Sequence, residues 1–157
     1  MPRTMQDVLQ VMDDMVSLEV ALAELYQACG EQFPEDKSFW TAIQHQEQLH
    51  AKLIRHLADL IRSHPQEFRF GRPFNSVAIK TTLSSVTNYT DSIRKGLLNR
   101  KRALFMARDI ENSVLEANYS DVVSTDNIEF RKTIELVSRD TLAHRNVFAA
   151  KVAKSRT

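Results

Sequence analysis

The sequence predicts an all-α protein in which two hairpins of long helices are joined by a long crossover. The 157 residues contain only 3 Gly and 4 Pro, and so few helix breakers favour long helices over many short strands. Good helix formers such as Leu, Ala, Glu and Lys are plentiful. Apolar residues also recur at helical spacing over four long stretches, so we expect a single helical domain spanning residues 1–157.

The overall composition limits the classes of function. A hydrophobic content of 43% and a charged content of 26% fit a soluble globular protein. The net charge is +1, which gives no reason to expect nucleic acid or an anionic membrane as a partner. The first residues lack an apolar signal core and no run of about 18 apolar residues occurs, so we expect a cytoplasmic protein.

The first predicted hairpin consists of helices over residues 4–30 and 36–63. Thr4 is a suitable N-cap with Asp7 three residues later, which is an acidic variant of the capping box. Asp36 can cap the second helix, and a proline follows each helix. The expected core positions of this hairpin are Val8, Val11, Met12, Met15, Leu18, Leu22, Leu25, Tyr26, Cys29, Phe39, Trp40, Ile43, Leu49, Leu53, Ile54, Leu57, Leu60 and Ile61.

The second predicted hairpin follows a crossover over about residues 64–98, which we expect to hold a loop and then one or two short helices. Its helices are predicted over residues 99–123 and 127–154, with a turn at 124–127. The expected inner positions are Leu104, Met106, Ala107, Ile110, Val114, Leu115, Val122, Ile128, Phe130, Ile134, Val137, Leu142, Val147, Phe148 and Val152. A bundle with one long crossover has the ferritin-like four-helix topology.

Acids and histidines lie on the expected inner faces of all four long helices. Glu47 and His50 are three residues apart, so they share one helix face and can converge on one ion. Glu19 and Glu111 each fall among apolar positions of their own helices. His144 resembles His50, because each has an apolar residue seven positions before it and three after it. This set is typical of a dinuclear carboxylate centre in a helical bundle.

A family resemblance extends over about residues 5–152. It depends on Glu19, Tyr26, Phe39, Trp40, the segment Gln46-Glu47-Gln48-Leu49-His50-Ala51, Glu111, Tyr119, His144 and Phe148. Together these residues resemble the rubrerythrin-type members of the ferritin-like superfamily. The resemblance implies two irons in a four-helix bundle and an oxidoreductase that reduces peroxide or reacts with oxygen. Some relatives instead oxidise or store iron.

The resemblance also assigns roles to the five candidate ligands. Glu19 and Glu111 would be terminal ligands, Glu47 would bridge, and His50 and His144 would each give one metal a nitrogen. Carboxylates with imidazoles suit iron or manganese, and zinc also fits.

The chain departs from the family at two points. Thr141 stands where the second Glu-x-x-His should place its glutamate, so one metal loses an oxygen ligand. The neighbouring Asp140 is a candidate substitute, although it lies about 100° around the helix. Two possibilities remain open: a pair of metals that binds more weakly, or a site that holds a single metal. Cys29 is the single cysteine, so the family's four-cysteine iron module is missing and electrons would come from a separate donor protein.

Two other classes of function are open. In a degenerate bundle the inward acids pair with imidazoles and tyrosine hydroxyls, and the protein is an interaction or structural module. The basic cluster Arg100–Arg102 could contact nucleic acid, but a solvated helix start explains it better and we expect no nucleic-acid partner. We expect His45, His56 and His64 on the surface. A homodimer is expected, because helical proteins of this class often dimerise.

Overall fold

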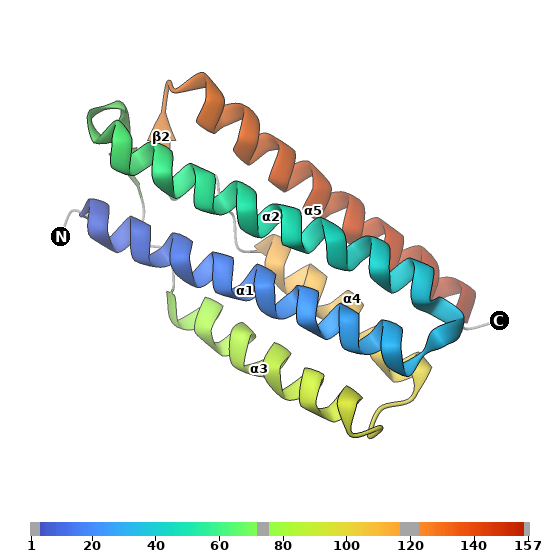
Figure 1. Ribbon diagram of the computed structural model, residues 1–157. Coiled ribbons are helices and arrows are strands. Elements are labelled where there is room, and N and C mark those ends of the chain that lie inside the picture. Colours follow the sequence, from blue (N-terminus) through green and yellow to red (C-terminus); the bar gives the residue numbers. More distant parts are fainter. Residues whose placement is uncertain (1–3, 72–75, 117–122, 156–157) are drawn as a thin grey trace.

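The computed structural model describes residues 4–71, 76–116 and 123–155, and within them the fold is helical (Figure 1). The helices are α1 (Met5–Gln32), α2 (Lys37–Ser63), α3 (Ser76–Arg94), α4 (Arg100–Glu116) and α5 (Ile128–Ser155), with two short strands, β1 (Phe68–Phe70) and β2 (Val123–Thr125). The all-α class is confirmed. α1 pairs with α2 and α3, and α5 packs against α2 and α4. None of the helices in these ranges is long and apolar enough to cross a membrane.

The helices α1 and α5 begin where the capping signals predict. Asp36 precedes α2 but its side chain makes no capping bond, because its carboxylate pairs with Arg100 and Lys151. Thr4 Oγ1 accepts a hydrogen bond of 3.2 Å from the Asp7 backbone N–H, and Asp7 Oδ2 accepts one of 2.9 Å from the Thr4 backbone N–H. Asn127 Oδ1 accepts a hydrogen bond of 2.9 Å from the Phe130 N–H at the start of α5. These bonds satisfy backbone donors that have no partner inside the helix, and so they fix the first turns.

The predicted core of α1 is confirmed, since all nine of its apolar positions are buried, Cys29 included. The predictions fail at Leu49 on α2 and at three positions of α5. Their exposed fractions are 46% for Leu49, 68% for Ile128, 48% for Leu142 and 43% for Val147. The buried face of α5 instead consists of residues 130, 134, 137, 141, 144, 148 and 152. Ile128, Leu142 and Val147 lie on other sides of this helix and are exposed.

After a 3-10 turn at Pro65–Glu67, the described part of the crossover contains the α-helix α3 of 19 residues, so the prediction that its α-helix would be short was wrong. Ile79, Val86 and Ile93 recur every seven residues and are buried on the side of α3 that packs against α1. The threonines of α3 do not end it, because their hydroxyls donate to the carbonyl four residues earlier. These bonds run from Thr81, Thr82, Thr87 and Thr90, at 2.8–3.0 Å.

A two-stranded antiparallel ribbon joins the crossover to the start of α5. Phe68 pairs with Thr125 and Phe70 with Val123. The sequence predicted a loop where β1 lies, so that prediction was wrong. It also predicted a helix end at Val123 followed by a turn at 124–127, and β2 stands there instead. Strands of three residues are too short to show an alternating pattern. Residues 117–122, including Tyr119 and Val122, and the side chains of Val114 and Leu115 lie outside the described part.

One buried carboxylate ties three helices together at one end of the molecule. Asp36, just before α2, accepts a hydrogen bond of 3.1 Å from Arg100 Nη2 at the start of α4. Lys151 Nζ, near the end of α5, lies 2.9 Å from Asp36 Oδ1. The hydrogen bond from Arg100 is the main reason that the pKa of Asp36 is lowered. Arg100 therefore has a structural partner, which supports the interpretation of the basic cluster as a helix start.

We predict that Asp36→Asn lowers the free energy of unfolding by about 1–2 kcal/mol at pH 7, because it removes charged hydrogen bonds whose partners are partly solvated. A lowered folded pKa means that this carboxylate stabilises the fold above its unfolded pKa of about 3.9. The contribution is lost as pH falls through the lower folded value. Urea unfolding should therefore show the difference at pH 7 and show it narrowing below about pH 4.

The matched control for this measurement is Asp59→Asn, because Asp59 is 69% exposed and pairs with Arg62 on its own helix. A control variant as unstable as Asp36→Asn would contradict the special role of Asp36.

Candidate metal centre

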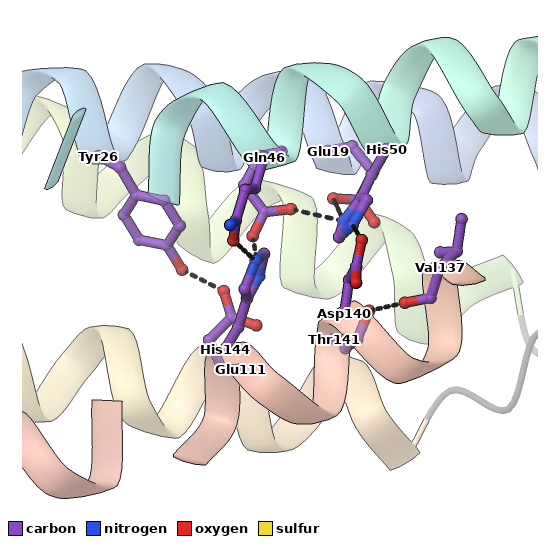
Figure 2. A network of polar contacts seen from close by, with 10 residues as sticks. Glu19, Tyr26, Gln46, His50, Glu111, Val137, Asp140, Thr141 and His144 are labelled. Carbon is purple, nitrogen blue, oxygen red and sulfur yellow. Dashed lines mark hydrogen bonds and ion pairs between the residues drawn. The ribbon is translucent and has the colours of Figure 1, made fainter. Parts of the chain in front are cut away.

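Four helices direct acids and imidazoles into one buried volume (Figure 2). Glu19 comes from α1, Glu47 and His50 from α2, Glu111 from α4 and His144 from α5. Their exposed fractions are only 1–2%. The structure therefore brings together all five side chains that the sequence singled out, whereas His45, His56 and His64 are exposed as expected.

The carboxylate of Glu47 lies between the two imidazoles. Its Oε1 is 2.9 Å from His144 Nδ1, and its Oε2 is 3.4 Å from His50 Nδ1. The two rings stack with centroids 5.3 Å apart. One donor atom from each of these three residues lies within 4.8 Å of the others, which is the spacing of a group that could hold a metal ion. Glu19 Oε2 is 4.0 Å from His50 Nδ1.

The outer nitrogens of both imidazoles are held from the surface side. His50 Nε2 lies 3.3 Å from Asp140 Oδ2, and His144 Nε2 contacts Gln46 Oε1 (Figure 2). Both partners are acceptors, so each Nε2 carries the proton and donates it. In the neutral form of each imidazole, Nδ1 then carries a lone pair that faces Glu47. Metal-ligating histidines are oriented in this way, with the second nitrogen donating to a carboxylate or a carbonyl.

Unpaired polar atoms are concentrated at this centre. Seven buried side-chain oxygen or nitrogen atoms of the described residues have no hydrogen-bond partner, and four of them belong to this group. They are Glu19 Oε2, Glu47 Oε1, His50 Nδ1 and His144 Nδ1. Buried polar atoms without a partner are costly, and these four all face inward. A cation among them, or a proton shared between them, would satisfy them.

Burial and mutual repulsion divide the charges among the three carboxylates. Burial, and then the charge of Glu47, raises the pKa of Glu19 and of Glu111 well above the usual value. Burial also acts to raise the pKa of Glu47, but the neighbouring side chains of Glu19, His144 and His50 outweigh it and hold that pKa well below its usual range. Glu19 and Glu111 therefore bind protons more readily than Glu47 does.

A buried tyrosine fixes the position of Glu111. Tyr26 donates a hydrogen bond of 2.6 Å from its hydroxyl to Glu111 Oε1 (Figure 2). Its ring packs against Trp40 and Phe148, with centroids 5.7 and 5.5 Å away. Burial, followed by repulsion from Glu111, raises the pKa of Tyr26, so the hydroxyl remains a donor. The sequence associated Tyr26 with Glu19 on the same helix, and only the packing of α1 near α4 shows its true partner.

Among the described residues, no neighbouring carboxylate replaces the glutamate that is missing at Thr141. Thr141 is 4% exposed, and its hydroxyl donates a hydrogen bond of 2.8 Å to the Val137 carbonyl of its own helix. Asp140, the candidate substitute, contacts the outer nitrogen of His50 instead.

The contacts of Gln46 and Asp140 with the outer histidine nitrogens were not predicted from the sequence. A signal for both was present, because each lies four residues before a histidine of the cluster. Each one contacts the histidine of the other helix, so the pairing is crosswise between α2 and α5.

Comparisons of the chain with protein-family models, curated proteins and solved structures find no match. Fold and site define the class: an all-α protein with a buried carboxylate and imidazole group that could hold a metal ion. Any finer assignment depends on the geometry of this group.

We predict that Tyr26→Phe lowers the free energy of unfolding by about 1–3 kcal/mol, because it leaves Glu111 Oε1 buried without its donor. Urea unfolding at pH 7 measures the effect. The control is Tyr89→Phe, since Tyr89 is 38% exposed on α3. Equal stability of the two variants would show that the bond to Glu111 contributes nothing.

Proposed function

We propose that this chain is a ferritin-like metal protein whose centre is built around Glu47, His50 and His144. The observation that carries the proposal is the arrangement of the two imidazoles. Both Nε2 atoms are occupied from outside, and both Nδ1 lone pairs face one carboxylate without a donor between them. Lone-pair atoms that face one another repel unless a cation or a proton lies among them.

The ferritin-like assignment is supported by which helices contribute to the group. In bundles of that kind the ligands project inward from four helices, with one long connection between the two hairpins. Here α1, α2, α4 and α5 supply the side chains, and the segment with α3 connects the hairpins. α3 packs outside this set, against α1 (Figure 1).

Iron is the metal that we propose, with manganese and zinc as alternatives, since carboxylate and imidazole donors suit all three. A bound iron would supply redox chemistry toward peroxide or oxygen, or the oxidation of Fe(II). The chain's own side chains would hold the metal and exclude water, because all five are nearly fully buried. Electrons would come from a separate donor protein, since a single cysteine cannot form a four-cysteine iron site.

A metal-free structural module is the second candidate, and specific contacts favour it. The 2.9 Å separation of His144 Nδ1 and Glu47 Oε1 also suits an ion pair. Burial acts to lower the pKa of His50, but the neighbouring carboxylates of Glu47 and Asp140 outweigh it, so that pKa is raised. In this alternative, protons satisfy the buried group and the protein serves as an interaction module.

Metal loading separates the two candidates. After anaerobic Fe(II) loading and desalting, we expect elemental analysis to find iron in the wild type and none in Glu47→Ala or His144→Ala. His45→Ala, an exposed histidine of α2, is the control that should keep its metal. Free metal at 100 times its Kd should raise the free energy of unfolding by about 2.7 kcal/mol. A wild type that loads no more than Glu47→Ala would favour the structural module.

Redox activity needs its own test. We predict that peroxide added to the Fe(II)-loaded and desalted wild type produces a near-ultraviolet ferric absorption band, and that desalted Glu47→Ala, which retains no iron, shows none. Absence of a band in a loaded wild type would remove the oxidoreductase proposal and leave metal binding intact.

A further inference from the structure

We infer that the centre takes one metal ion per chain and not the pair that a ferritin-like bundle implies. This inference rests on the proposed metal binding and concerns its stoichiometry. Three features of the described residues support it: the number of carboxylates, the charge that they can balance, and the separation of the donor atoms.

The carboxylates are one too few for a pair. A two-ion centre of this kind uses two isolated glutamates and two Glu-x-x-His motifs, and so it has four carboxylates and two imidazoles. Among the side chains that the structure describes, Glu19, Glu47 and Glu111 are the carboxylates of the buried group. Thr141 stands where the fourth glutamate would be, and its hydroxyl donates a hydrogen bond to the Val137 carbonyl on its own helix. Asp140 contacts the far side of His50 and offers the centre no oxygen (Figure 2).

Charge balance favours a single ion for the same reason. Two divalent ions bring four positive charges, and three carboxylates can offset only three of them. The remaining charge would lie among side chains that are at most 2% exposed, where an uncompensated charge is costly. One divalent ion is balanced by Glu47 and either Glu19 or Glu111. Asp140 is 32% exposed, so solvent screens its charge from the centre.

The donor atoms of Glu47, His50 and His144 lie close enough for one ion to draw them together. Neighbouring donors on a single ion with bonds of about 2.1 Å lie about 3 Å apart. His144 Nδ1 and His50 Nδ1 lie 2.9 and 3.4 Å from the two oxygens of Glu47. All three residues place a donor within 4.8 Å of the others. Two imidazoles and one carboxylate on a single ion form a known type of iron or zinc site.

Manganese(II) is the probe that tests this inference, because its EPR spectrum distinguishes an isolated ion from an exchange-coupled pair. The wild type, Thr141→Glu and Thr141→Gln are loaded anaerobically with Mn(II), desalted and analysed for metal per chain. We expect the wild type and Thr141→Gln to hold one isolated ion. Thr141→Glu restores the fourth carboxylate, so we expect it to hold two ions with a coupled spectrum. The glutamine variant controls for side-chain size without charge.

The outcomes are distinguishable from failure of the proposed function. A wild type with two coupled ions would overturn the inference and keep the metal centre. A wild type without metal would overturn both. A folded Thr141→Glu with one ion would show that Thr141 does not set the stoichiometry, and the argument from carboxylate number would fail. If Thr141→Glu does not fold, as circular dichroism would show, the metal content and spectrum of the wild type decide the question.

Discussion

The burial of the Glu47 carboxylate is the constraint on which the rest of the interior depends. An ionised carboxylate can lie in a helical core only where neighbouring groups compensate it. Two imidazoles and two protonatable glutamates surround Glu47, and they come from four helices. The helices are therefore arranged around a polar centre as well as around an apolar core. Whether a cation or protons provide the final compensation is what separates a metal protein from a structural module.

Polar side chains outside this centre orient the imidazoles and one of the carboxylates inside it. Gln46 and Asp140 hold the outer nitrogens of the opposite histidines, and Tyr26 holds Glu111. Because one outer partner is a neutral amide and the other is a carboxylate, the two imidazoles differ in charge environment although their positions correspond. A carboxylate partner makes an imidazole more basic, and Asp140 contributes to the raised pKa of His50.

The remaining structure keeps the four helices in register. Asp36 joins the start of α2 to α4 and α5 at one end. At the other end, Thr125 Oγ1 donates to the Glu67 carbonyl at 2.6 Å, and Asn127 Nδ2 donates to Glu67 Oε2 at 2.7 Å. α3 packs against α1. Side chains on different helices must meet within a few tenths of an ångström to share a ligand, so such ties at both ends matter for the centre.

The sequence by itself determined the local features: the helix starts at Thr4 and Asn127, the buried face of α1, and the placing of Glu47 and His50 on one face. Capping and the helical period depend on neighbouring residues, which is why those predictions held. Only the tertiary structure decided the length of α3, the ribbon, the exposure of Leu142 and the partners of Tyr26 and Asp140. Those depend on which face of one helix meets another, and residues far apart in the chain set that packing.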